Sequence, residues 1–261
     1  MIPAERQHFI LACLADRDVM SIAELTERLG VSHMTVRRDI QKLEESGRVM
    51  SVSGGVKLPE RIEFEPSHHV KAEICAAEKQ AIGRAAAELV REGAVIYLDA
   101  GTTTLEIAHG IVDRPGLTVV TNDFVIAAYL AANSRCALYH TGGLVERTNQ
   151  SCVGDATADA IGRFNFDVAF ISGSSWSIAG ITSPSESKRP VKRAAVRTAR
   201  RAVFVTDSSK YGVIGAFNIL PLDGFDAVIT DAGIEASVVA AIEHLGVEVT
   251  IARADNGGRR A

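Results

Sequence analysis

The stretch from residue 21 to residue 48 places the strongest constraint on the fold, because it predicts two short helices separated by a tight turn. Ser21 and Glu24 have the Ser-x-x-Glu spacing of a capping box, which marks the start of a helix. Gly30 tolerates the left-handed backbone of a sharp turn, and Ser32 can cap the next helix. The apolar face of this second helix consists of Val36, Ile40 and Leu43. The spacing predicts a helix-turn-helix that ends near Gly47.

The outer face of the second predicted helix is polar and basic, so it can donate to phosphates or read base edges in DNA. After it, two β-prone runs flank Gly54 and Gly55, which predicts a hairpin that forms a wing. An apolar stripe after Pro3 predicts a first helix that completes a three-helix core. The residues predicted to contact DNA are Ser21, Ser32, His33, Thr35, Arg37, Arg38, Gln41, Arg48, Ser53 and Lys57.

The residues of this region also resemble a known family. The run Val31-Ser32-x-x-Thr35-Val36-Arg37-Arg38-Asp39-Ile40-x-x-Leu43-Glu44, followed by the glycine pair of the wing, is similar to the DeoR family of bacterial transcription regulators. The sequence departs from the family at Ser53, where the family usually has His. The resemblance implies a winged helix-turn-helix that binds double-stranded operator DNA, and such proteins usually act as a homo-oligomer, here a dimer or tetramer.

The length and the charge of the chain are compatible with such a protein. With 261 residues, two domains of unequal size are expected. The net charge of −4 looks wrong for a DNA-binding protein, but six Lys or Arg stand against three acids between residues 28 and 57. Affinity for DNA follows such a local patch, so the acidic remainder argues only against a sequence-blind nucleic-acid binder.

Cysteines, histidines and apolar runs argue against disulfides, metals and membranes. The four cysteines are scattered without a Cys-x-x-Cys pair, as expected for reduced thiols in a cytosol. His68 and His69 lack further ligands at metal-site spacing. The apolar run at residues 9–15 is too short for a signal peptide, and no apolar run reaches membrane-spanning length. We therefore expect a cytoplasmic protein without metal or cofactor.

The hydrophobic pattern changes along the chain and predicts its domains. Residues 1–58 form the DNA-binding domain, and the charged, proline-containing residues 59–73 form a linker. Residues 74–253 alternate between helix and strand, which predicts a mostly parallel sheet covered on both faces, and residues 254–261 form a tail. The expected strands cover residues 94–98, 117–120, 137–140, 167–171, 202–205, 227–229 and 247–251. The fold class is therefore α/β, with an N-terminal winged helix-turn-helix.

Small polar residues follow five of the predicted strands. In an open parallel sheet ligands bind beyond the carboxyl ends of the strands, so this convergence predicts a polar ligand site. Residues 101–104 enter a helix, whose free N–H groups and hydroxyls can hold an anion such as phosphate, and Lys210 can neutralise it. Glu186 and Lys192, near the start of a later helix, are candidates to reach the same site. The plainer alternatives are threonines that only cap a helix and lysines that are only solvated.

The resemblance to the DeoR family extends over this domain and so covers roughly residues 3–250. It is carried by Leu98-Asp99-Ala100-Gly101-Thr102-Thr103-Thr104, Val119-Val120-Thr121-Asn122-Asp123, Thr141-Gly142-Gly143 and Asp207-Ser208-Ser209-Lys210-Tyr211-Gly212. It implies a sugar-phosphate sensor domain related in fold to ribose-5-phosphate isomerase. The effector-binding residues that it implies are Asp99, Gly101, Thr102, Thr103, Thr104, Asn122, Gly142, Gly143 and Lys210, to which we add Gly173, Glu186 and Lys192.

A serine-rich loop with the single tryptophan, Ser172-Gly173-Ser174-Ser175-Trp176-Ser177, departs from the usual family pattern. This loop and residues 31–35 look similar to a subgroup associated with four-carbon sugar-acid catabolism. The expected function is therefore a repressor of a carbohydrate or sugar-acid catabolic operon. Its expected effector is a phosphorylated sugar or sugar acid.

An enzyme of the sugar-phosphate isomerase type, with an appended DNA-binding domain, is the rival interpretation. Such an isomerase needs a carboxylate for proton transfer, and related isomerases carry Asp residues after the strand that here ends at Ser172 and Gly173. No acid stands there, although Asp99 and Asp207 follow other strands, so we expect no enzyme. A nucleotide-binding protein is not favoured, because the sequence lacks the glycine-rich phosphate motifs.

Overall fold

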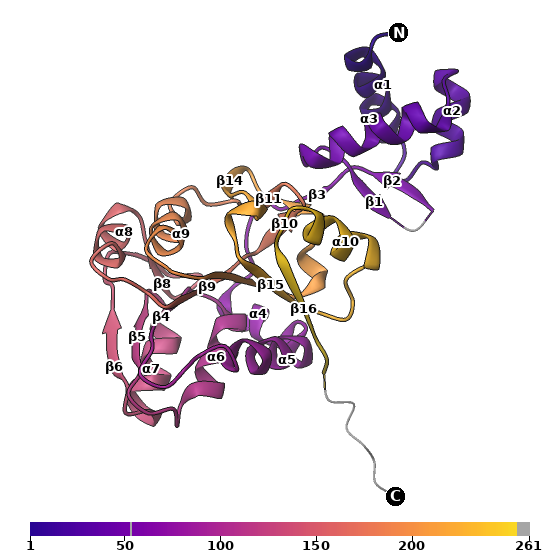
Figure 1. Ribbon diagram of the computed structural model, residues 1–261. Coiled ribbons are helices and arrows are strands. Elements are labelled where there is room, and N and C mark those ends of the chain that lie inside the picture. Colours follow the sequence, from indigo (N-terminus) through magenta and orange to yellow (C-terminus); the bar gives the residue numbers. More distant parts are fainter. Residues whose placement is uncertain (53, 255–261) are drawn as a thin grey trace, which may run out of the picture.

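The computed structural model describes residues 1–52 and 54–254, which form a small N-terminal domain and a larger sheet domain (Figure 1). The small domain consists of helices α1 (Pro3–Ala15), α2 (Ile22–Leu29) and α3 (His33–Glu45) and strands β1 (Met50–Val52) and β2 (Gly55–Lys57). The predicted capping box is confirmed, because the Glu24 N–H donates to Ser21 Oγ and the Ser21 N–H donates to the Glu24 carboxylate. Gly30 has a φ of 63°, as the predicted turn requires.

An apolar core holds the three helices and the wing together. It contains Ile10, Leu14, Met20, Leu25, Leu29, Val36, Ile40, Leu43, Val49 and Val56. Asp39, which is 2% exposed, faces this inner side of α3 and accepts from Arg6 Nε of α1 at 2.6 Å. Glu44 of α3 accepts from the Ser51 N–H of the wing at 2.9 Å. Both contacts fix the orientation of α3, the helix predicted to read DNA.

The wing forms as an antiparallel pair, in which Met50 pairs with Lys57 and Val52 pairs with Gly55. Gly55 is therefore part of β2 rather than of the turn between the strands. Its Cα lies close to the backbone of Met20, where a Cβ would come within 2.2 Å of the Met20 carbonyl oxygen. The second glycine of the pair is thus needed for the approach of the wing to the helices.

A parallel sheet of seven strands forms the centre of the larger domain, in the order β16-β15-β12-β9-β4-β5-β6. These strands are β4 (Val95–Leu98), β5 (Thr118–Thr121), β6 (Ala137–His140), β9 (Val168–Ser172), β12 (Ala202–Val205), β15 (Ala227–Asp231) and β16 (Glu248–Ala252). The predicted α/β architecture is confirmed. The inner strands are continuous apolar runs because helices bury both of their faces, and every residue of β9 and β12 is buried.

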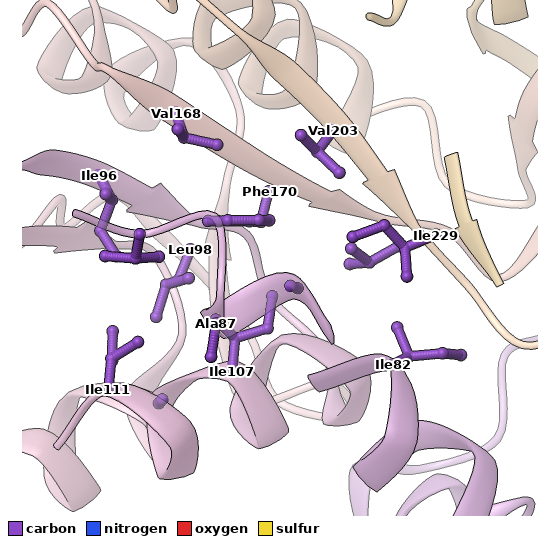
Figure 2. Close-up of a cluster of buried hydrophobic side chains, with 14 of the residues drawn as sticks. Ile82, Ala87, Ile96, Leu98, Ile107, Ile111, Val168, Phe170, Val203 and Ile229 are labelled. Atoms are coloured by element: carbon purple, nitrogen blue, oxygen red, sulfur yellow. The ribbon is translucent and has the colours of Figure 1, made fainter. Parts of the chain in front are cut away.

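Two helical layers cover this sheet. On one face lie α5 (Ala76–Ala87), α6 (Thr102–Ile111) and α7 (Phe124–Asn133), and on the other lie α8 (Asp155–Ile161), α9 (Lys188–Arg197) and α10 (Ala236–His244). Figure 2 shows the first layer, where Ile107 and Ile111 of α6 point toward Leu98 of β4. The second layer packs around Phe204 and Trp176, whose rings meet edge to face at 5.5 Å between centroids. These cores fix the strand ends from which the polar loops project.

Several short elements were not expected from the sequence. Residues 59–73, predicted as a linker, contain β3 (Glu60–Arg61) and α4 (His68–Glu73). The loop after β6 contains β7 (Leu144–Glu146) and β8 (Ser151–Val153). The serine-rich loop contains β10 (Ser175–Ser177), and β11 (Gly180–Ser183) follows it. Strand β14 (Phe217–Leu220) joins β11, and β13 (Val213–Ile214) pairs with β3. The 3-10 turns are η1 (Ser208–Lys210) and η2 (Leu222–Gly224).

In the described ranges, no helix combines the length and the apolar character needed to cross a membrane.

Candidate functional site

The order of the parallel strands places the loops after β4 and β9 at a point where the sheet reverses direction. From β4 the chain continues to β5 and β6 on one side, whereas β9, β12, β15 and β16 follow on the other side. A crevice opens at such a point beyond the carboxyl ends of the strands. A cavity of about 440 Å³ lies here, lined by residues that include Asp99 after β4 and Ser172 to Ser174 at the end of β9.

The loop after β4 turns into α6 and presents the amino end of that helix to the cavity. Gly101 is the N-cap residue with a φ of 149°, a backbone conformation that L side chains rarely adopt. Thr102 and Thr103 line the cavity, and no hydrogen bond is found for their N–H groups within the described ranges. Free N–H groups at the start of a helix, together with the helix dipole, favour an anion.

Asp99 is 1% exposed, and its Oδ2 accepts from three donors. Its Oδ2 accepts from the Ser172 N–H at 3.0 Å and from Ser172 Oγ at 3.2 Å, and Lys192 Nζ donates to the same oxygen. Lys192 also donates to the Ser172 carbonyl oxygen at 2.9 Å. Asp99 therefore ties the ends of β4 and β9 to α9.

Basic side chains dominate the charged lining of the cavity. The basic residues are Arg61, Lys71, Lys79, Lys188, Lys192 and Lys210, whereas the acids are Glu60, Glu65 and Asp99. Lys210 Nζ lies 2.9 Å from Asp207 Oδ2. Burial raises the pKa of Asp207, but the charge of Lys210 and two hydrogen bonds outweigh this effect and hold that pKa below its usual value. The excess of cations makes an anionic ligand the favoured occupant.

Lys79 differs from the other lysines of the cavity. It is 2% exposed, and its ammonium donates to the carbonyl oxygens of Lys71 and Ile74. In the part of the chain that the structure describes, no carboxylate forms an ion pair with it. Burial and the charge of Lys210 lower the pKa of Lys79 to about 8.

Ser151 adds a further polar group to the cavity wall. It is 1% exposed, and its Oγ has no hydrogen-bond partner in the described ranges. Buried hydroxyls without a partner are rare in folded proteins. A polar ligand in the cavity would supply this partner.

Eight of the residues predicted to bind an effector line this one cavity. They are Asp99, Gly101, Thr102, Thr103, Asn122, Gly173, Lys192 and Lys210. The side chain of Asn122 is held by its own contacts, because it accepts from Tyr97 Oη at 2.9 Å and donates to the Cys152 carbonyl oxygen at 2.8 Å. The predicted convergence of strand ends is therefore present in the structure, while ligand binding by these residues stays a prediction.

The structure does not bring Thr104, Gly142, Gly143 or Glu186 to this cavity. Thr104 is fully buried, and its hydroxyl donates to the carbonyl oxygens of Asp99 and Gly101, which shapes the loop. The Gly142 carbonyl oxygen accepts from Thr157 Oγ1, and a Cβ on Gly143 would come within 2.1 Å of that hydroxyl. This glycine pair therefore serves the packing of its turn on α8.

Glu186 precedes α9 and lines a different groove, between α8 and α9. The helix begins two residues later, so Lys188 and Lys192, one helical turn apart, face the cavity beyond β4 and β9 instead. The sequence reasoning also missed Glu65, Lys71, Lys79 and Asn149. Lys188 was not predicted either, although the sequence shows it within a charged helix start.

The predicted DNA-contacting residues mostly lie on one exposed surface. His33, Arg37, Arg38 and Gln41 are exposed on α3, Thr35 is partly exposed, and Arg48 and Lys57 flank the wing. The hydroxyls of Ser21 and Ser32 are engaged as helix caps. Ser53 lies outside the described residues. The outer face of α3 therefore offers two unburied guanidinium groups and an imidazole to a DNA groove, in the arrangement that helix-turn-helix proteins use.

Two domains of one protein family match the two parts of the chain just described. The DeoR-like helix-turn-helix domain matches residues 6–61, and the DeoR C terminal sensor domain matches residues 74–232. The chain belongs to the DeoR family. The expectation from the resemblance of its motifs is thereby confirmed, and the mixed winged-helix and α/β architecture is that of a DeoR-type transcriptional regulator.

Relatives of this DeoR-family protein align over nearly the whole chain. The HTH-type transcriptional regulator YgbI of Escherichia coli strain K12 is 51% identical over 97% of this chain and 99% of its own length. An HTH-type transcriptional regulator of Haemophilus influenzae is 51% identical over 95% and 97%, respectively. The glycerol-3-phosphate regulon repressor of Escherichia coli strain K12 is 29% identical over 95% and 100%. All three are named as transcriptional regulators or repressors.

Among solved structures, ribose 5-phosphate isomerase A from Methanocaldococcus jannaschii matches with a TM-score of 0.38 and 16% identity. The match covers 52% of this chain and 55% of that chain.

Proposed function

We propose that this DeoR-family protein represses a carbohydrate or sugar-acid catabolic operon, and that a phosphorylated sugar or sugar acid in the cavity controls its binding to the operator. In this proposal residues 1–58 bind DNA, residues 74–253 bind the effector and form the oligomer, and residues 59–73 connect the two. The finer prediction of a four-carbon sugar acid belongs to the same proposal. The protein acts as a dimer or tetramer on paired half-sites.

One observation carries the proposal: a cavity with an excess of basic side chains lies at the amino end of α6, in a chain that also has a winged helix-turn-helix. A phosphate binds to free helix N–H groups and lysines, and the hydroxyls of a sugar need the polar side chains that surround them. The names of two relatives agree with this effector class. They are a glycerol-3-phosphate regulon repressor and a putative aga operon transcriptional repressor of Escherichia coli.

An isomerase activity is not favoured, because the two buried carboxylates of the cavity, Asp99 and Glu65, are held in ion pairs. Asp99 accepts from Ser172 and Lys192, and Glu65 accepts from two lysines. A general base must be able to reach the proton that it removes. Ser172 ends β9 and Gly173 follows it, at the position where the related isomerases are expected to carry acids.

The test is fluorescence anisotropy of the full-length protein with the DNA upstream of its gene, at fixed salt, against a scrambled fragment. Phosphorylated sugars, four-carbon sugar acids and their phosphates are then titrated in. We expect specific binding that one compound of this panel releases. Specific binding that the whole panel leaves unchanged would refute the effector proposal, and binding without sequence preference would refute the regulator.

Two variants assign the two roles to residues. Arg37→Ala should weaken operator binding by about 1–3 kcal/mol, whereas Arg17→Ala, an exposed arginine outside α3, should not. Lys210→Met should keep operator binding but weaken the release by the effector. Unchanged release by Lys210→Met would remove this lysine from the site.

A further inference from the structure

Glu65 places a carboxylate of the connecting segment inside the cavity. Its side chain is 8% exposed, although the segment was predicted as a solvated linker. Glu65 Oε2 lies 2.7 Å from Lys188 Nζ and 3.2 Å from Lys71 Nζ, and Ser174 Oγ donates to Oε1 at 2.8 Å. Two lysines and a hydroxyl from three separate elements therefore converge on one carboxylate.

The charge around Glu65 favours an anion at this position. Burial opposes its ionisation, but the charges of Lys188 and Lys71 outweigh burial and hold the pKa of Glu65 far below its usual range. Lys71 forms no other ion pair within the described ranges. Lys188 forms one further ion pair, in which its Nζ lies 3.5 Å from Glu146 Oε2. The two ammonium groups and Ser174 would bind the carboxylate or phosphate of a ligand in the same way.

The backbone that carries Glu65 is also connected to the wing. Strand β3 pairs with β13, since the Glu60 N–H donates to the Gly212 carbonyl oxygen and the Ile62 N–H donates to that of Ile214. Gly212 packs against Met50 of β1, where a Cβ would come within 2.2 Å of Met50 Cε. Residues 60–65 therefore connect the cavity to the Gly212–β13 segment, which contacts Met50 of the wing.

We propose that Lys71, Lys188 and Ser174 form an anion subsite that Glu65 occupies in this structure, and that an anionic group of the effector displaces Glu65 from it. Displacement removes the contact that holds the connecting segment in the cavity, so β3 loses its anchor and the DNA-binding domain changes its position. This inference rests on the proposed effector role of the cavity. It adds the specific site of the anion and the internal group with which the anion competes.

The test uses the full-length protein and inorganic phosphate as the probe, with calorimetry at constant ionic strength. Glu65→Gln removes the competing charge but keeps the size of the side chain, so phosphate should bind about tenfold more tightly. The matched control is Glu63→Gln, which changes the same net charge at an exposed position of the same segment that does not line the cavity. Its affinity for phosphate should equal that of the wild type.

A second measurement follows the connecting segment in the wild type. Trypsin cleavage after Arg61, a residue of β3, should become faster as phosphate saturates the protein, and in Glu65→Gln it should be fast without phosphate. Glu65→Ala removes the whole carboxylate and leaves the three groups of the subsite in place, so it should raise the phosphate affinity at least as much as Glu65→Gln. This variant also tests the inference if Glu65→Gln does not fold.

The outcomes separate this inference from the function on which it rests. Phosphate that binds equally to the wild type, Glu65→Gln and Glu65→Ala overturns the displacement and leaves the effector cavity standing. The same holds for a cleavage rate at Arg61 that phosphate does not change. No binding of phosphate to any of the variants overturns both.

Discussion

The affinity of the cavity for anions should depend on pH through Lys79. The ammonium of this buried lysine donates only to carbonyl oxygens in the described ranges, and burial together with the charge of Lys210 lowers the pKa of Lys79 to about 8. The charges of Asp207 and Cys75 act in the opposite direction, and Lys71 adds to the lowering. Near neutral pH Lys79 is therefore charged, but it loses its proton about two pH units earlier than an exposed lysine does.

A bound anion stabilises the charged form of Lys79 and returns its pKa toward the usual value near 10.4. Between pH 7 and pH 9 the complex then keeps the proton, while the free protein loses it. With a pKa of about 8, the protonated fraction of the free protein falls about tenfold over this interval. The affinity for the anion should fall by the same factor, which is about 1.4 kcal/mol of binding free energy.

Calorimetry with inorganic phosphate at about pH 7, 8 and 9, at constant ionic strength, measures this change. Inorganic phosphate is a mixture of monoanion and dianion near pH 7 and becomes the dianion toward pH 9, so the wild type and each variant are compared at the same pH, where this titration of the probe cancels. Lys79→Met should bind phosphate more weakly than the wild type at about pH 7 and should show little further loss toward pH 9. Lys42→Met removes the same charge from an exposed position of α3 outside the cavity, and should keep the wild-type profile.

The argument would be refuted if the phosphate affinity of Lys79→Met fell between pH 7 and pH 9 as steeply as that of the wild type. Such a result would assign the pH dependence to another group of the cavity, such as Lys71, whose pKa is also lowered by burial. An affinity of the wild type that is equal at pH 7 and pH 9 would show that the anion does not interact with Lys79.

Three further predictions concern stability. Asp39→Ala should lower the free energy of unfolding of the N-terminal domain by about 3 kcal/mol, because it leaves the partly buried Arg6 guanidinium without its carboxylate. Urea denaturation measures this change, and an unchanged midpoint of the unfolding transition would contradict it. Ser21→Ala should cost about 1 kcal/mol through loss of the α2 cap, with Ser21→Thr as the control that keeps it. Burial raises the pKa of Asp123 to about 6, so folding favours its protonated form. The contribution of this shift to the free energy of unfolding is full below about pH 4 and is lost as pH rises through about 6. Thermal unfolding should therefore show Asp123→Asn gaining on the wild type by up to about 3 kcal/mol between these pH values, and parallel curves would refute the shift.

Local signals made the N-terminal domain predictable. Ser21, Glu24 and Gly30 each determine the conformation of their own turn, so the helix boundaries follow from neighbours in the sequence. The inner strands of the sheet were predictable for a similar reason, because burial on both faces turns β9 and β12 into apolar runs. The polar strand ends then followed from the general position of ligand sites in parallel sheets.

Contacts between distant residues were not predictable in this way. Strand β3 is two residues long and has no periodicity, and it forms only because β13, about 150 residues later, offers a free edge. Glu65 looks like a solvated acid until Lys188 of α9 is placed beside it. Glu186 was chosen instead of Lys188, because the sequence leaves the start of α9 uncertain by two residues.

In the proposed function, the segment from η1 to β13 would connect a ligand in the cavity to the DNA-binding domain. Ser209, Lys210 and Val213 line the cavity, whereas the intervening Gly212 supports β3 and Met50 of the wing. The ring of Tyr211 packs edge to face on Trp176 at 4.9 Å between centroids, which fastens the segment to the sheet domain.

A ligand shifts an equilibrium only by the difference between its affinities for the two arrangements. Such a difference arises where the ligand contacts a group that moves, and both Lys210 and Glu65 belong to segments that contact the ligand cavity on one side and the DNA-binding domain or its connection on the other. A rigid contact, such as the Asp99–Lys192 pair between β4 and α9, would bind the effector equally in both arrangements. Variants at Lys192 should therefore change only the affinity for the effector, whereas variants at Glu65 should change both this affinity and the effect of the effector on operator binding.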